Sequence, residues 1–250
     1  MRIAITGKGG SGKSTVAGAL ARQFARRGLK VVAIDADPNP NLGVCLGLPR
    51  DSVETMEPIL NALLASGHTH NDPRPAAEDL LARYGLEAPD GVVVVATGKI
   101  ERPSSACLCC GSHNTTRQFF SELPADGRIV VADLEAGLND LLWAKPGNDD
   151  VVVAVAEPSA KAVEVARRAC RVAEQMGVTR IIGLANRSSS PEEVALLTEI
   201  LGVEVMSVAE DPGVEKADQQ GVAPLDLDGT SPAMVDIARL ADRILAVQPA

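Results

Sequence analysis

The sequence predicts an α/β protein with a mostly parallel central sheet that is covered by helices on both faces. Short runs of Val, Ile and Ala alternate along the chain with longer stretches of helical periodicity, and a glycine-rich turn follows the first run. The chain has 250 residues, of which 46% are hydrophobic, and it shows no internal repeat or long linker. We therefore expect residues 1–250 to form one domain.

A series of apolar runs of strand length is expected to form the sheet. Their hydrophobic residues are nearly continuous, which is typical of strands that are buried on both faces. They are Arg2–Thr6, Lys30–Asp35, Gly91–Thr97, Arg128–Asp133, Asp150–Ala156, Arg180–Ala185 and Val203–Val208.

Helical periodicity fills most of the intervals between these runs. Gly28 is placed to end the first helix, and the polar stretch Ser66–Pro75 is expected to be a loop within the domain. The expected helices are Val16–Arg27, Val53–Ala65, Ala76–Tyr84, Ala160–Met176, Pro191–Leu201 and Ser231–Val247.

Composition narrows the possible functions. A net charge of −9 argues against nucleic acid as the main partner. The apolar runs are far shorter than a membrane span, and Met1 leads directly into a strand without a signal pattern, so we expect a cytoplasmic protein. The five cysteines then indicate free thiols, metal binding or redox chemistry, because disulfide frameworks are rare in that compartment.

The glycine-rich turn fits the pattern G-x-x-x-x-G-K-S/T over residues 7–14. A strand precedes it and a helix follows it, which favours a phosphate-binding loop for ATP or ADP over a plain turn. Its backbone N–H groups would surround the phosphates, Lys13 would reach the β- and γ-phosphates, and Ser14 would ligate Mg²⁺. The nucleotide contacts predicted here are Gly9, Gly10, Ser11, Gly12, Lys13, Ser14 and Thr15.

A second lysine, Lys8, stands early in the same turn. The turn thereby resembles the deviant Walker A signature, K-G-G-x-G-K-S/T, of the MinD/ParA/nitrogenase-iron-protein class of P-loop ATPases. The resemblance implies that Lys8 crosses the interface of a nucleotide-dependent homodimer and contacts the partner's nucleotide. The alternative is a solvated loop lysine.

Carboxylates stand at or just after the ends of two predicted strands, at the sheet edge where ligands bind in this fold class. Asp133 is interpreted as the carboxylate that holds Mg²⁺ through water. The resemblance implies that Asp37 orients or activates the attacking water. Two roles are open for Asp35, in the Mg²⁺ shell or as a cap of the turn.

Three further segments match the same class of ATPases. Gly137, in the sequence DLEAG, resembles a glycine that turns its N–H toward the γ-phosphate. Asn186 and Arg187 stand where the class places its adenine-binding asparagine, whose amide can pair with the base. Asp211 opens a segment that resembles the later base-contacting loop, on a weaker match.

Three cysteines, Cys107, Cys109 and Cys110, follow the strand Gly91–Thr97. In an extended segment, Cys107 and Cys109 would point to one side and Cys110 to the other. Two thiolates half-fill a tetrahedral site, and a second copy of the chain would complete it. Two alternatives stay open, a Cys-x-x-Cys pair that includes Cys110 and an ordinary redox-sensitive loop. His113 is interpreted as solvated rather than as an auxiliary ligand.

The chain closely resembles the CooC family, ATPases that help to insert nickel into carbon monoxide dehydrogenase. The matching segments are TGKGGSGKST, DADPN, TGKIE with CLCC, DLEAGL, AEPS and ANR. The resemblance implies nickel or zinc bridging a dimer through Cys107 and Cys109, and a client metalloenzyme. The remaining cysteines, Cys45 and Cys170, are interpreted as core thiols.

Three rival functions belong to the same class. A nitrogenase-type iron protein would carry a second cluster cysteine in residues 133–139, where none occurs, so a four-iron, four-sulfur cluster is less favoured. A MinD-type switch would end in a basic amphipathic membrane helix, whereas Ser231–Val247 carries balanced charges. DNA partition would require basic patches that the sequence lacks. The client enzyme and the metal stay open.

Overall fold

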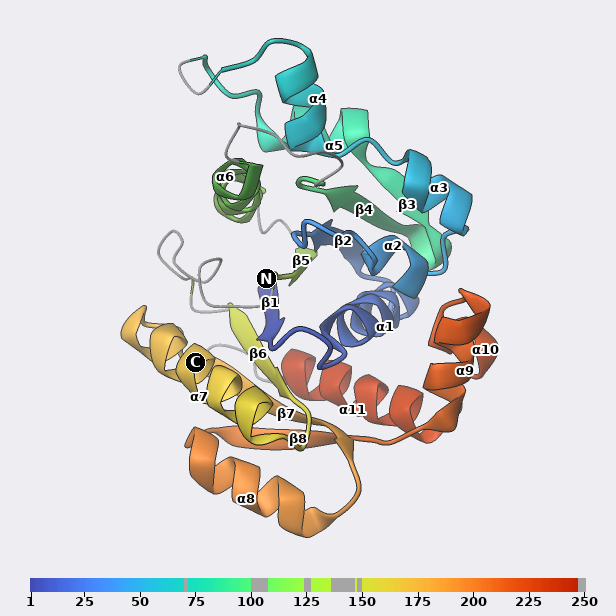
Figure 1. The fold of residues 1–250 in the computed structure, drawn as a ribbon, viewed down its shortest axis with the longest axis vertical. Helices are drawn as coiled ribbons and strands as arrows, with labels where there is room; N and C mark the ends of the chain where they lie inside the picture. The colour runs from blue at the N-terminus through green and yellow to red at the C-terminus, as the bar shows by residue number, and fades with distance from the viewer. Residues whose placement is uncertain (70–71, 100–107, 124–126, 136–146, 148–149, 247–250) are drawn as a thin grey trace.

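A computed structural model describes residues 1–69, 72–99, 108–123, 127–135, 147 and 150–246. Within these residues the strands form one eight-stranded sheet in the order β3-β4-β2-β5-β1-β6-β7-β8 (Figure 1). All neighbouring strands are parallel except β3, which pairs antiparallel with β4 at one edge. The predicted α/β fold class with a mostly parallel sheet is confirmed.

Each predicted strand is present, and β3 is an addition. Its three residues are too few to show a hydrophobic pattern in the sequence. The strands are β1 (Arg2–Gly7), β2 (Lys30–Asp35), β3 (Leu86–Ala88), β4 (Val92–Ala96), β5 (Arg128–Asp133), β6 (Val151–Ala156), β7 (Arg180–Ser188) and β8 (Glu204–Ala209).

The helices differ from expectation in two respects. The stretch expected as one helix, Val53–Ala65, is divided into two, because Pro58 disfavours helical backbone at the residue before it. Helices α2, α6, α9 and α10 also form in segments for which no helix was predicted. The helices are α1 (Lys13–Arg26), α2 (Leu42–Cys45), α3 (Arg50–Thr55), α4 (Ile59–Ala65), α5 (Ala77–Tyr84), α6 (Leu108–Glu122), α7 (Ala160–Gln175), α8 (Pro191–Leu201), α9 (Pro212–Gln220), α10 (Pro224–Leu227) and α11 (Pro232–Ala246), with a 3₁₀ turn at Pro89–Gly91.

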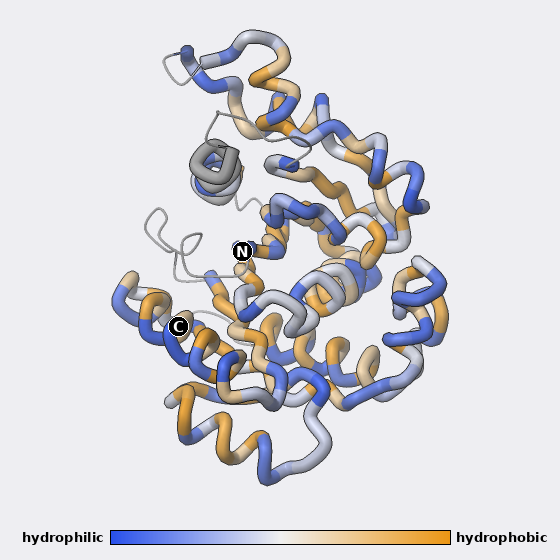
Figure 2. The backbone as a smooth tube through the Cα atoms, in the orientation of Figure 1, coloured by the Kyte–Doolittle hydropathy of each residue, from blue (hydrophilic) through white to orange (hydrophobic). Residues whose placement is uncertain are grey.

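The sheet separates two hydrophobic cores. Ile3 and Ile5 of β1 belong to the core that contains Phe24 of α1 and the buried side of α11. Ala4, which points to the other face, belongs to the core that contains Phe119 of α6 and the buried side of α7. Hydrophobic residues accordingly concentrate on the strands and along one side of the helices (Figure 2). Burial on both faces explains why the strands are continuously apolar.

Parallel pairing brings the predicted site residues to one edge of the sheet. β1 lies between β5 and β6, and the glycine-rich turn leaves its carboxyl end. Asp35 at the end of β2 is in register with Asp133 at the end of β5. β7 carries Asn186 at the same edge, two strands from β1. The fold thereby gathers groups that are up to 175 residues apart in sequence.

Candidate functional site

The glycine-rich turn between β1 and α1 has the backbone shape of an anion cradle. Gly10 and Gly12 adopt positive φ angles of 81° and 90°, and Ser11 N–H donates to the carbonyl of Lys8 at 3.1 Å. A Cβ on Gly12 would lie 2.3 Å from Nδ2 of Asn186, so this position accepts only glycine. α1 begins at Lys13 without a side-chain cap from any described residue, which leaves its first N–H groups available to phosphate.

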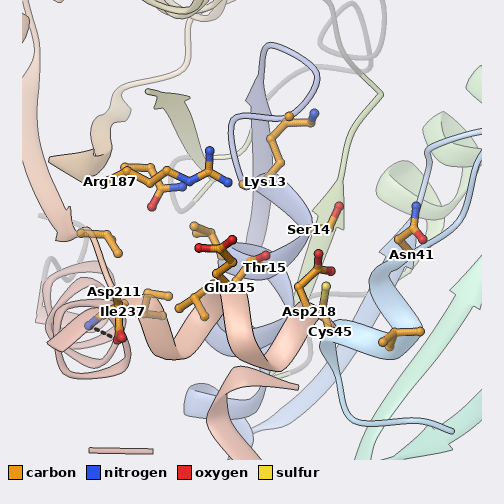
Figure 3. A pocket seen from close by; sticks show the side chains of 18 of the residues that line it. Lys13, Ser14, Thr15, Asn41, Cys45, Arg187, Asp211, Glu215, Asp218 and Ile237 are labelled. Carbon is orange, nitrogen blue, oxygen red and sulfur yellow. Dashed lines mark hydrogen bonds between the residues drawn. The ribbon is translucent and has the colours of Figure 1, made fainter. Parts of the chain in front are cut away.

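A cavity of about 950 Å³ opens beside this turn (Figure 3). Its walls come from the turn and α1, from the segment after β2, from β7, and from α9 with the start of α11. The predicted site residues on its lining are Gly9, Gly10, Gly12, Lys13, Ser14, Thr15, Asp37, Asn186, Arg187 and Asp211. Size and lining suit a nucleotide, with the phosphates toward the turn.

Lys13, Ser14 and Asp133 meet at the start of α1. The Lys13 side chain is nearly buried, and its Nζ lies 3.5 Å from the carbonyl oxygen of Lys8. Asp133 is 1% exposed, and its Oδ1 accepts no hydrogen bond from any residue that the structure describes. Burial raises the pKa of Asp133 to about 6, although the Ser14 hydroxyl and the charge of Lys13 lower it. A buried carboxylate oxygen without a partner, beside a serine hydroxyl, fits a hydrated Mg²⁺ ion.

We expect the change Asp133→Asn to stabilise the protein in the absence of nucleotide and Mg²⁺. The folded-state pKa of about 6 exceeds the ordinary value of 3.8, so the native state loses stability as pH rises through this interval. Removing the charge should raise the free energy of unfolding at pH 7.5 by on the order of 1–3 kcal/mol. At pH 4 the gain should be much smaller, because Asp133 is then protonated in the native state and partly protonated in the unfolded chain.

Urea unfolding at pH 7.5 and pH 4 measures this difference. The matched control is Asp150→Asn, which removes the charged partner of Arg2, whose Nε donates to Asp150 at 2.9 Å. That variant should be destabilised at pH 7.5. Equal destabilisation of both variants would show that the charge on Asp133 carries no stability cost.

Asp35 holds the turn that follows β2. It is fully buried, and its two oxygens accept the N–H groups of Leu42 at 2.8 Å and Asp37 at 3.3 Å. Burial and then the adjacent charge of Asp133 raise its pKa well above the usual range. Both Asp35 oxygens are engaged by backbone N–H groups of the turn, so of its two predicted roles the geometry favours the cap.

Asp37 faces the cavity from this turn. It is half-buried, and its Oδ1 accepts the N–H of Asn39 at 2.8 Å. The Asp35 contact sets the backbone and the Asn39 contact sets the side chain, which together aim a carboxylate toward the phosphate end of the cavity.

Asn186 and Arg187 lie on a β-bulge in β7. The register with β8 shifts between Asn186 and Ser188, and Arg187 takes a positive φ of 58°. Asn186 is buried, and its Nδ2 donates to the carbonyl of Ser11 at 2.7 Å. The amide predicted to bind adenine therefore also anchors the glycine-rich turn, a contact that sequence spacing does not reveal.

Asp211 caps α9 at the cavity wall. Its carboxylate accepts the N–H groups of Gly213 at 2.8 Å and Ala233 at 3.2 Å. Burial alone would raise the pKa of Asp211, but hydrogen bonds from Ser231 and from these amides hold it below the usual value. Asp211 lines the cavity while it fixes the start of α9, so its direct contribution is to the shape of the wall.

Part of the cysteine segment, including Cys107, lies outside the described residues, and so does Gly137. Cys109 and Cys110 fall in the first turn of α6, so the prediction of an extended segment was wrong for these two residues. Among the described residues, no group of three or more His, Cys, Asp and Glu could hold a metal ion.

The two other cysteines differ from each other. Cys170 is buried in the core as predicted. Cys45 is half-buried and lines the cavity, so the prediction of a core thiol was wrong. Burial raises the pKa of Cys45 to about 12, which keeps this thiol protonated beside Thr15. α2 reaches this position because Gly18 of α1 lets the Cys45 backbone approach to 2.8 Å of where a Cβ would lie.

Sequence reasoning missed several charged groups around the cavity. Glu215 and Asp218 of α9 project toward α1 across the cavity (Figure 3). Arg50 lines the same cavity from α3. No motif marks these residues, because they come from short helices whose placement depends on tertiary contacts. Within the described residues, no helix is both long and apolar enough to cross a bilayer.

An anion cradle at a helix start, with a carboxylate in reach of Mg²⁺, is the phosphate site of a P-loop ATPase. Residues 3–225 match the CobQ/CobB/MinD/ParA nucleotide-binding domain, and the chain belongs to this family of ATPases. It is 30% identical over 255 residues to the carbon monoxide dehydrogenase accessory protein CooC of Rhodospirillum rubrum, with 95% of this chain and 93% of that protein covered.

Two other comparisons extend over the whole chain. An ATP-binding protein of Methanocaldococcus jannaschii is 28% identical over 258 residues, which cover 99% of each chain. The MinD protein of Pyrococcus horikoshii, solved with Mg-ADP, superposes with a TM-score of 0.74 at 19% identity, covering 100% of this chain and 98% of that one. At that identity the superposition shows a shared fold. The resemblance to the MinD/ParA class and to CooC that the motifs predict is confirmed.

Proposed function

We propose that this ATPase is a metallochaperone in which ATP binding closes a homodimer and hydrolysis reopens it, so that a metal ion is delivered to a metalloenzyme. The observation that carries the proposal is the run of three cysteines within residues 107–110, which follows β4 along the chain. The relative CooC, an accessory protein of carbon monoxide dehydrogenase, supports nickel as the metal and that enzyme as the client.

We assign a role to each predicted group of the ATP site. Lys13 neutralises the β- and γ-phosphates, and the N–H groups at the start of α1 bind their oxygens. Ser14 and Asp133 would hold Mg²⁺, which when bound neutralises charge on the transferred phosphoryl group. Asp37 orients the attacking water from the turn that Asp35 fixes. Lys8 is assigned to the partner's nucleotide in the closed dimer.

The metal site requires two chains. A pair of thiolates from each chain would supply four sulfur ligands, which suit zinc and also nickel. Thr97 links this region to the ATP site, because its N–H donates at 2.9 Å to the carbonyl of Asp35. Closure of the dimer would bring the two cysteine segments together, so metal and ATP should each favour the binding of the other.

Metal analysis of anaerobically purified protein tests this function. We expect one bridging nickel or zinc ion per two chains in the ATP-bound state, with sulfur ligands visible by X-ray absorption spectroscopy. The double variant Cys107→Ser/Cys109→Ser should lose the metal, whereas Cys110→Ser should have a milder effect. Cys170→Ala, which removes a thiol from the core, is the matched control.

Three results would contradict the bridging site. They are one metal ion per chain, retention of metal in the double variant, and metal content that is insensitive to ATP. A brown protein with acid-labile sulfide would instead identify an ATPase that carries an iron–sulfur cluster.

A further inference from the structure

The lysine assigned to the partner's nucleotide is bound within its own chain. Lys8 Nζ lies 3.1 Å from Oε1 of Glu157, the residue that follows β6. The Glu157 side chain is 20% exposed and that of Lys8 is 38% exposed, so water screens the pair only in part. The hydrogen bond from Lys8 is the largest of several contacts that lower the pKa of Glu157, so this carboxylate is charged at neutral pH.

Glu157 is fixed independently of Lys8. The Ser159 hydroxyl lies 3.2 Å from the same Oε1 while it also caps α7. Oε2 lies 3.7 Å from Nη1 of Arg187, which the bulge in β7 turns toward it. Because Arg187 and Ser159 stay in place, the carboxylate keeps partners when Lys8 leaves, and the contact can open and close reversibly.

We propose that Glu157 is a positioning residue that retains Lys8 on its own chain and thereby opposes ATP-dependent dimerisation. This inference rests on the proposed function, in which Lys8 must reach the partner chain. In this inference, reaching the partner's nucleotide draws Lys8 Nζ away from Glu157, so each chain gives up this contact on closing. ATP binding by the single chain does not require the change, because Glu157 lies outside the cavity lining.

The expected effect on dimerisation is moderate and measurable. A partly exposed ion pair changes an equilibrium constant by a few-fold, and two such pairs open for each dimer formed. Glu157→Gln removes the charge with little change in shape, so it should lower the dimer dissociation constant about tenfold. The difference should shrink in 0.5 M salt, where charges are screened within about 4 Å.

Analytical ultracentrifugation with saturating ATPγS and Mg²⁺ measures the dissociation constant. Glu164→Gln is the matched control, because it removes the same charge from a glutamate that also pairs with two cations, Arg167 and Arg168. That variant should dimerise like the wild type. The double variant Lys8→Ala/Glu157→Gln should stay as monomeric as Lys8→Ala, since Glu157 acts through Lys8.

The outcomes separate this inference from the proposed function. If Lys8→Ala dimerises like the wild type, the interface role of Lys8 fails, and the proposed dimer mechanism with it. If Lys8→Ala is monomeric while Glu157→Gln dimerises no more tightly than the wild type, only the retention of Lys8 by Glu157 is overturned. Dimerisation of the double variant would likewise overturn it, because Glu157 would then act without Lys8.

Discussion

Lys13→Met should bind ATP about 100-fold more weakly than the wild type and should show no measurable hydrolysis. A lost hydrogen bond between charged groups costs about 1.5–3 kcal/mol, which corresponds to this range of affinity. Lys13 is nearly buried at the start of α1, where water cannot easily replace its charge. Methionine keeps the length of the side chain, so the turn should keep its shape and the variant should fold.

Titration with a fluorescent ATP analogue measures the affinity, and phosphate release measures the hydrolysis. Lys161→Met is the control, because Lys161 is an exposed lysine in the first turn of α7. This control should match the wild type in both assays. An affinity of Lys13→Met within about threefold of the wild type would place the phosphates away from Lys13, since even a weak charged contact is worth more than that.

The parts of the fold that sequence predicted are those with a strong local signal. The runs at Lys30–Asp35 and Arg128–Asp133 became β2 and β5 with the predicted bounds, because buried parallel strands are continuously apolar. The glycine-rich turn was equally clear, since its positive φ angles at Gly10 and Gly12 require the residue type that the motif contains.

The parts that sequence did not predict depend on contacts between distant segments. Asn186 reaches Ser11 across 175 residues, and Lys8 reaches Glu157 across 149. No pattern among neighbouring residues in the sequence indicates either contact. The whole of α6 was missed, and its first turn, LCCGS, contains glycine, serine and cysteine, which are poor or neutral helix formers.

Structural roles at the cavity wall have a related cause. Asp211 was interpreted as part of a base-contacting loop from a resemblance, and the structure adds that its two oxygens accept backbone N–H groups of α9 and α11. Cys45 was placed in the core because its neighbours in sequence are apolar, but a four-residue helix turns it to the cavity. A polar side chain near a ligand site can contact the ligand or can hydrogen-bond to the protein around the site. The positions of its hydrogen-bond partners in the structure are needed to tell which.

Asp37→Asn should bind ATP within about twofold of the wild type but hydrolyse it about 100- to 1,000-fold more slowly, the range expected when a group that activates water is lost. Asp37 comes from the turn after β2 and not from the glycine-rich turn, so we expect phosphate binding to survive the change. Asparagine keeps an Oδ1 that can accept the N–H of Asn39, as Asp37 does at 2.8 Å, so the turn should be preserved.

Single-turnover hydrolysis at saturating Mg-ATP isolates the chemical step from product release. Asp79→Asn, on the exposed side of α5, makes the same chemical change away from the cavity and should hydrolyse ATP at the wild-type rate. Wild-type turnover by Asp37→Asn would show that another group positions the water.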